Sequence, residues 1–86
     1  MIEIYGTSSC VWCDRARELC EQYSMEYKYK SLDDRFDGTQ YMTEFQTKLP
    51  GIKTVPQIFW NGNHIGGFND LATEIENTRN FGQEKI

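Results

Sequence analysis

The chain has 86 residues, enough for one small domain with a single hydrophobic core, and its five tyrosines, five phenylalanines and two tryptophans favour a folded globule over a disordered chain. Its net charge of −4 comes without a cluster of lysines and arginines, which argues against nucleic acid as a partner. There is no membrane-spanning apolar run and no signal-peptide pattern at the N-terminus, so we expect a cytoplasmic protein without a membrane partner, whose three cysteines are reduced except during turnover.

The first predicted elements are a short apolar strand, Ile2 to Tyr5, and a helix, Val11 to Tyr23, joined by a turn. Cys10 and Cys13 stand at the start of this helix. Unpaired backbone N–H groups and the helix dipole favour a negative charge there, so we expect Cys10 to be the thiolate nucleophile. Cys13 lies one turn further and can close a disulfide with Cys10, which completes thiol–disulfide exchange. The alternatives are two buried structural cysteines or half of a zinc site.

The third cysteine and the histidine are predicted to be structural. Cys20 falls in the apolar stripe of the first helix with Ala16 and Leu19, which is typical of a small buried hydrophobe; a third redox cysteine is the alternative. His64 lies on a later predicted strand, remote from that helix. Zinc requires four convergent ligands, and the three cysteines with His64 do not form such a set, so we predict no metal site.

The middle of the chain predicts a second strand and a second helix. Residues 25–30 alternate strictly, which predicts a half-buried edge strand with Tyr27 and Tyr29 inward and Lys28 and Lys30 toward solvent. The strand–helix–strand order implies a parallel pair joined by a right-handed crossover. A second helix is predicted from about Thr39 to the residue before Pro50, and its apolar face consists of Tyr41, Met42, Phe45 and Leu49.

A hairpin and a last helix complete the predicted domain. Asn61-Gly62 predicts a type I′ turn between antiparallel strands over 57–60 and 63–66. Asn69 is predicted to cap the last helix, whose periodicity fades from about Arg79. We therefore expect one domain over residues 1–78 and a frayed tail over 79–86. The predicted class is α/β, with the order β-α-β-α-β-β-α and a four-stranded mixed sheet flanked by helices.

Three segments together resemble the glutaredoxin family. They are Tyr5 to Cys13 (YGTSSCVWC), Thr54 to Phe59 (TVPQIF) and His64 to Leu71 (HIGGFNDL), in the family's order and spacing. The two cysteines alone are shared by many thioredoxin-fold proteins, whereas the TVP segment followed by the GG-x-x-D segment is specific to glutathione users. The resemblance extends to about Asn77 and implies a thioredoxin-like fold with a cis peptide before Pro56.

The resemblance also implies a site. The backbone of Val55 would hold the cysteinyl part of glutathione, and Asn69 and Asp70 would hold its γ-glutamyl end. Asp70 can equally be an acid that complements the helix dipole. Trp12 and Phe68 would flank the groove, although both could instead be core residues. The implied set is Cys10 and Cys13 as catalytic residues and, for glutathione, Trp12, Thr54, Val55, Pro56, Gly67, Phe68, Asn69 and Asp70.

The sequence departs from the common family pattern at two places. Val11 and Trp12 stand where many relatives have proline and tyrosine. Thr7 stands where many relatives have a lysine or arginine that would meet a glutathione carboxylate. Lys53 is a candidate substitute for that basic group, and a plain solvent-facing lysine is the alternative.

The resemblance implies a glutathione-dependent thiol–disulfide oxidoreductase that reduces protein disulfides and glutathione mixed disulfides through the Cys10–Cys13 dithiol. Its expected partners are glutathione and disulfide-containing or glutathionylated proteins, such as ribonucleotide reductase, and we expect a monomer. One alternative is a homodimeric [2Fe–2S] carrier that also uses two glutathiones as ligands. This stays open because Val11 lacks the constraint of proline, although Trp12 is bulky near such an interface. The other alternative is a thioredoxin-like donor reduced by a flavoprotein reductase.

Overall fold

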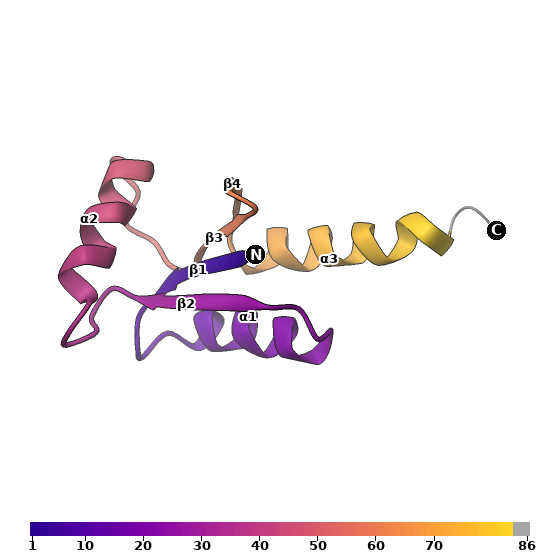
Figure 1. Ribbon diagram of the computed structural model, residues 1–86, viewed down its shortest axis with the longest axis horizontal. Coiled ribbons are helices and arrows are strands. Elements are labelled where there is room, and N and C mark those ends of the chain that lie inside the picture. The colour runs from indigo at the N-terminus through magenta and orange to yellow at the C-terminus, as the bar shows by residue number, and fades with distance from the viewer. Residues whose placement is uncertain (84–86) are drawn as a thin grey trace.

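The chain folds in the predicted order of strands and helices. A computed structural model describes the backbone of residues 1–83 and the side chains of residues 1–78. The elements, shown in Figure 1, are β1 (Ile2–Gly6), α1 (Val11–Gln22), β2 (Tyr27–Ser31), α2 (Gly38–Lys48), β3 (Gln57–Trp60), β4 (Asn63–Gly66) and α3 (Phe68–Gln83). Of the expected tail, residues 84–86 lie outside the described residues, and the domain boundary at residue 78 stays a prediction. No described helix is long and apolar enough to span a membrane.

The four strands form one mixed sheet in the order β2-β1-β3-β4. β1 pairs in parallel with β2, because α1 carries the chain back over the sheet between them. β1 and β3 are antiparallel, as are β3 and β4. The predicted edge position of the second strand is therefore confirmed, and so is the mixed sheet.

Alternation along β1 divides the side chains between two cores. Ile2 and Ile4 face α1 and α3, whereas Tyr5 faces α2 on the other side of the sheet, so the helices cover both faces (Figure 1). The first core contains Ile2, Ile4, Ala16, Cys20, Ile58, Leu71 and Ile75. The second contains Tyr5, Phe45, Leu49 and Phe59.

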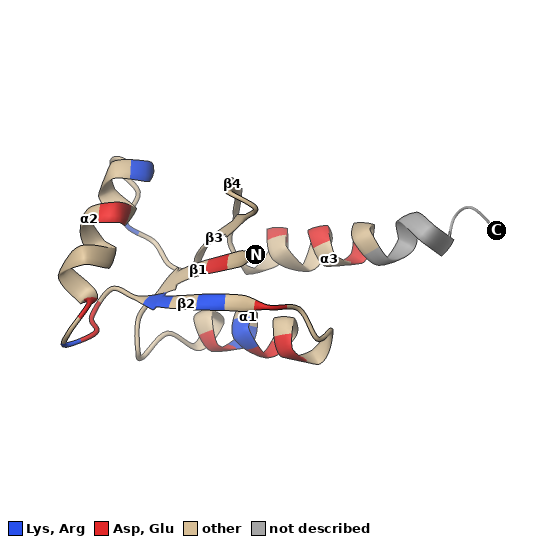
Figure 2. Ribbon diagram, in the orientation of Figure 1, with Lys and Arg blue, Asp and Glu red and all other residues tan. Residues whose placement is uncertain are grey.

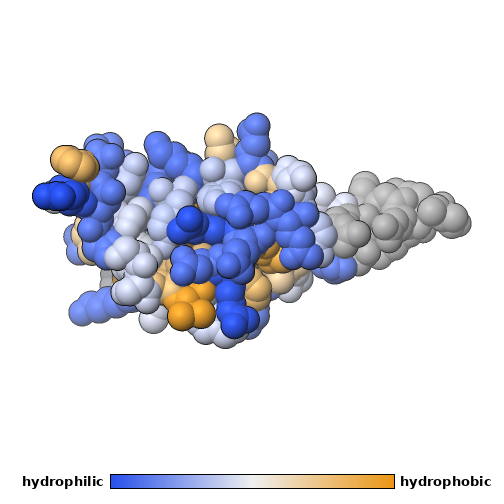
Figure 3. Space-filling model, turned by 90° about the horizontal axis from the view of Figure 1, so that it is seen from below, coloured by the Kyte–Doolittle hydropathy of each residue, from blue (hydrophilic) through white to orange (hydrophobic). Residues whose placement is uncertain are grey.

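The hairpin turn has the predicted backbone. Asn61 and Gly62 have φ values of 52° and 85°, and a type I′ turn requires positive φ at both central residues. The outer face of α1 is exposed and carries Asp14, Arg15 and Glu18. In Figure 3, which views the molecule from below, this side is mostly hydrophilic with small apolar patches.

Lys30 does not face solvent, and the prediction for this residue was wrong. Its side chain lies between the sheet and α2 and is only 8% exposed as a residue. Its Nζ is 3.0 Å from Glu44 Oε1 and 3.3 Å from Glu3 Oε2, and it lies 3.4 Å from the buried Tyr5 hydroxyl. Lys28, on the same face, is exposed. Figure 2 shows the basic positions on β2. Alternation placed Lys30 on the correct face, but α2 covers that face at one end.

Two expectations for the helices also need correction. Met42 is 37% exposed, and the buried apolar side chains are those of Phe45 in α2 and of Leu49, the residue that caps its C-terminus. Asn69 does not cap α3, because the helix begins at Phe68 and the Gly67 carbonyl already accepts the Leu71 N–H at 3.0 Å. Gly67 is thus the capping residue. Asp70, three residues on, accepts the Gly67 N–H at 3.0 Å, as the acid of a capping box does.

Candidate active site

Cys10 is the N-cap residue of α1. Its backbone is extended (φ −104°, ψ 112°), and its Sγ accepts the Cys13 backbone N–H at 3.1 Å. The sulfur therefore receives one of the unpaired N–H groups at the positive end of the helix, which favours a thiolate. Cys10 is half-buried, and both cysteines are free thiols in this structure.

Cys13 lies behind Cys10 and is fully buried. Burial raises the pKa of the Cys13 thiol to about 11, with a smaller contribution from its hydrogen bond to Cys10. The accessible sulfur at the helix N-terminus and the buried one a turn later have different chemical roles. Cys10 can attack an incoming disulfide, whereas Cys13 can attack only the Cys10 sulfur, once that sulfur has formed a mixed disulfide with a substrate.

The turn that carries Cys10 is tied to the loop after β2. The Ser8 N–H and hydroxyl both donate to the Asp33 carboxylate, the latter at 2.7 Å. Hydrogen bonds from Ser31 and then from Ser8 lower the pKa of Asp33 to about 2, so this carboxylate stays ionised at neutral pH. The contact fixes the turn through a residue 25 positions away in the sequence.

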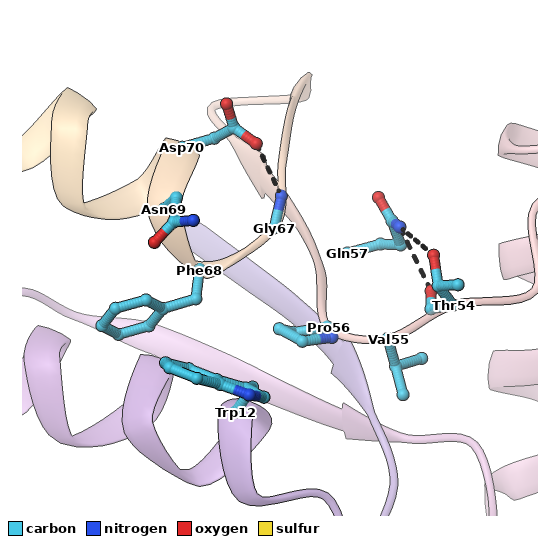
Figure 4. A pocket seen from close by; sticks show the side chains of 9 residues that line it. All are labelled: Trp12, Thr54, Val55, Pro56, Gln57, Gly67, Phe68, Asn69 and Asp70. Atoms are coloured by element: carbon cyan, nitrogen blue, oxygen red, sulfur yellow. Dashed lines mark hydrogen bonds between the residues drawn. The ribbon is translucent and has the colours of Figure 1, made fainter.

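A groove of about 440 Å³ opens beside Cys10. Its rim includes the aromatic rings of Trp12 and Phe68, whose centroids are 5.3 Å apart, and Trp12 is 52% exposed (Figure 4). The Val55–Pro56 peptide is cis, as the resemblance implied. Cys10 Sγ lies 3.9 Å from the Val55 carbonyl oxygen, which connects the nucleophile to the groove. The lining residues are Trp12, Thr54, Val55, Pro56, Gln57, Gly67, Phe68, Asn69 and Asp70.

The structure therefore brings all eight predicted glutathione-binding residues to one groove next to the two predicted catalytic residues. Sequence reasoning missed Gln57, whose side-chain amide donates to the Thr54 carbonyl and hydroxyl, each at 3.1 Å (Figure 4). Gln57 is the first residue of β3 and directly follows Thr54-Val55-Pro56. Its position beside this segment is the sequence signal that could have added it to the predicted site. His64 contacts Gln57 Oε1 at 2.8 Å through its Nε2 and does not line the groove.

One end of the groove is acidic. Asp70 is the one acidic or basic residue among the described residues that line it. The Arg15 guanidinium lies 5.0 Å from the centroid of the Trp12 ring, which lines the groove. Lys53 is exposed, and its role as a substitute for the missing basic residue stays a prediction.

Cys20 belongs to the core rather than to this site. It is fully buried among apolar residues, and burial raises the pKa of its thiol to about 11, so it behaves as the small hydrophobe that was predicted. Within residues 1–78, no group of three or more histidine, cysteine or acidic side chains is arranged to hold a metal ion.

Comparison with known proteins identifies the family. The family model for glutaredoxin matches residues 2–65. The chain belongs to the glutaredoxin family. Glutaredoxin 1 of Escherichia coli is 37% identical over 76 residues, which span 85% of this chain and 89% of the relative. Glutaredoxin 1 of Salmonella typhimurium is 37% identical over 81 residues, with 91% and 93% coverage.

Solved glutaredoxins share the fold. A crystal structure of a buckwheat glutaredoxin–glutathione complex has a TM-score of 0.71 at 26% identity and covers 90% of this chain and 69% of that chain. Glutaredoxin 1 from Francisella tularensis, complexed with cacodylate, has a TM-score of 0.70 at 28% identity, with 92% and 95% coverage. The predicted thioredoxin-like fold is confirmed. Glutaredoxins are thiol–disulfide oxidoreductases, and the Cys10–Cys13 pair gives this chain the two thiols for such an exchange.

Proposed function

We propose that this glutaredoxin is a glutathione-dependent oxidoreductase that reduces glutathione mixed disulfides and protein disulfides. The observation that carries the proposal is the position of the groove. It starts at Val55, whose carbonyl oxygen is 3.9 Å from the nucleophilic sulfur, and extends to Asp70 at the N-terminus of α3. A tripeptide with a thiol in its middle and a charged amino-acid group at one end matches this arrangement.

Each part of glutathione has a counterpart in the groove. The cysteinyl part would pair with the Val55 backbone in the manner of a short added strand, which places its sulfur next to Cys10. The α-carboxylate of the γ-glutamyl part would meet the backbone N–H groups at the start of α3, and its ammonium group would meet Asp70. The rings of Trp12 and Phe68 would cover its apolar stem. The crystal structure of a buckwheat glutaredoxin of the same fold is a complex with glutathione, which supports the choice of ligand.

The proposed reaction is two successive thiol–disulfide exchanges. The Cys10 thiolate attacks the glutathione sulfur of a mixed disulfide, the bond between that sulfur and the substrate breaks, and the substrate leaves as a thiolate. A second glutathione thiolate then attacks the sulfur of the Cys10-bound glutathione, which yields glutathione disulfide and restores the Cys10 thiolate. For a protein disulfide, Cys13 instead attacks Cys10 Sγ and displaces the reduced protein. Ribonucleotide reductase is a proposed substrate of this second kind.

The direct test is a coupled assay in which NADPH and glutathione reductase regenerate glutathione and a glutathionylated disulfide is the substrate. Turnover that requires glutathione is expected. Turnover with thioredoxin reductase, and none with glutathione, would contradict the proposal and favour a thioredoxin-like donor. An absence of turnover with both reductases would contradict it as well.

The substitution Asp70→Asn tests the groove. The asparagine side chain would keep an oxygen that accepts the Gly67 N–H, so the start of α3 is retained, but the charge that faces the ligand's ammonium group is lost. A charge-assisted hydrogen bond contributes about 1.5–3 kcal/mol, so kcat/KM for the glutathionylated substrate is expected to fall about 10- to 100-fold. The control is Glu74→Gln, which removes the same charge from an exposed position one turn further along α3. Equal activities of the two variants would contradict the assigned role of Asp70.

A further inference from the structure

The resolving cysteine has a tyrosine hydroxyl beside it that the groove does not use. Tyr29 extends from β2, and its hydroxyl donates a hydrogen bond to the Thr7 carbonyl at 2.6 Å. A Cβ added to Gly6 would lie 2.6 Å from Cys13 Sγ and would clash with the Tyr29 hydroxyl as well. The Cys13 thiol and the Tyr29 hydroxyl therefore both lie next to the Cα of Gly6. They occupy space that any side chain at residue 6 would fill.

Cys13 must lose its thiol proton before it can attack Cys10. Its thiol is fully buried, and burial raises its pKa to about 11, so little of it is ionised at neutral pH. Only a thiolate attacks a disulfide, so resolution of a mixed disulfide on Cys10 requires this buried sulfur to lose its proton. Two neighbours act against the effect of burial, because the Thr7 backbone and the Tyr29 side chain both lower the pKa of Cys13.

The hydroxyl keeps its proton and stays a donor. Burial, followed by the nearby Cys13 thiol, raises the pKa of Tyr29 far above that of an ordinary tyrosine. The guanidinium of Arg17, one turn after Cys13 on α1, lies 4.7 Å from the centroid of the Tyr29 ring and covers it. Among the described residues, the ionisable groups that act on the hydroxyl are Cys13, Cys10 and Arg17.

We propose that Tyr29 is a positioning residue for the resolving step, whose hydroxyl turns from the Thr7 carbonyl to the Cys13 sulfur as that thiol becomes a thiolate. The proposal rests on the dithiol part of the proposed function. The Cys13 proton passes to solvent, and the thiolate attacks Cys10 Sγ. A bond forms between the two cysteines, the bond from Cys10 to the substrate sulfur breaks, and that sulfur leaves as a thiolate with the electron pair. The dithiol is oxidised and the substrate disulfide is reduced.

The test uses Tyr29→Phe and the chromogenic disulfide DTNB, which needs no glutathione. Attack by Cys10 releases one coloured thiolate in a phase that depends on the DTNB concentration, and attack by Cys13 releases the second in a phase that does not. Loss of the donor is expected to raise the apparent pKa of the second phase by about one unit and to slow that phase about threefold at neutral pH. The slowing is less than tenfold because a sulfur of higher pKa is also more nucleophilic, with a Brønsted slope of about 0.4–0.5.

Two controls separate this role from packing. Tyr27→Phe makes the same chemical change on the same strand, where the hydroxyl bonds Glu21 instead, and both phases are expected to match the wild type. In a Cys13→Ser background, Tyr29→Phe is expected to leave the first phase unchanged. A second phase with the wild-type rate and pH profile in Tyr29→Phe would overturn the proposal, and so would an equal slowing of the first phase. Because DTNB replaces glutathione, neither outcome depends on whether the glutathione groove is correctly assigned.

Discussion

Replacing Cys10 with serine is expected to lower glutathione-coupled turnover about a thousandfold or more, because the chain loses its nucleophile. No other described thiol can take over: Cys13 and Cys20 are both fully buried, and burial raises the pKa of each to about 11. Only Cys10 combines partial exposure with a sulfur that accepts a backbone N–H at a helix N-terminus. The measurement is NADPH consumption with glutathione reductase and a glutathionylated substrate.

Cys13→Ser is the informative partner of this variant. Reduction of glutathione mixed disulfides is expected to persist, because glutathione itself can resolve the intermediate on Cys10, whereas reduction of protein disulfides is expected to fall sharply. Cys20→Ala serves as the control, since it removes a thiol from the core at a distance from the groove. Residual activity in Cys10→Ser comparable to that of the wild type would contradict the assignment of Cys10 as the nucleophile.

Lys30→Met is expected to lower the free energy of unfolding by about 2 kcal/mol at neutral pH, measured by denaturant titration. Loss of one partner of a buried ion pair costs about 3–5 kcal/mol. We expect a smaller cost here because the Glu3 and Glu44 side chains are 27% and 30% exposed and remain partly solvated. Methionine fills a similar volume, so the loss comes mainly from two carboxylates deprived of their closest cation.

The pH dependence distinguishes this cause from a packing defect. The hydrogen bond from Lys30 lowers the pKa of Glu44, so Glu44 stabilises the wild type above the ordinary carboxyl value of 4.5 and loses this contribution as the pH falls through the lowered value. The variant has no such contribution to lose, and its deficit is therefore expected to shrink below about pH 5. Lys28→Met, on the same face but exposed, is expected to change stability by less than about 0.5 kcal/mol. A deficit that does not change with pH would contradict this explanation.

Local patterns were sufficient to predict the elements and the hairpin. Asn61-Gly62 specifies its turn because few other residue pairs adopt positive φ at both positions. The start of α1 could be predicted because the cysteine pair follows a short apolar strand and a turn. The groove could be predicted only through the family resemblance. Thr54, Phe68 and Asp70 carry no local signal that they lie near Cys10.

The predictions for Lys30 and Asn69 were wrong because a local pattern does not show what other parts of the chain contribute at that position. Lys30 points to the predicted face, yet α2 covers it there, and the carboxylates that pair with it come from β1 and α2. Asn69 has a good capping side chain, but α3 begins earlier, because Gly67 is the capping residue and its N–H donates to the Asp70 carboxylate. The approach of Tyr29 and Cys13 to Gly6 depends on the parallel register of β1 and β2, in which Ile4 pairs with Tyr29, and on the absence of a side chain at Gly6.

The groove takes its parts from three stretches of chain: α1 near Cys10, residues 54–57 and residues 67–70. In an unfolded chain these stretches have no fixed relation, so a molecule that fills the groove binds only the native state, and its binding free energy adds to that of folding. At a concentration about one hundred times its Kd, such a ligand stabilises the native state by about 2.7 kcal/mol. Domains of this size have small stabilities, so this is a large share of the total. Under the proposed function, the glutathione pool that supplies electrons would also raise the free energy of unfolding of the protein.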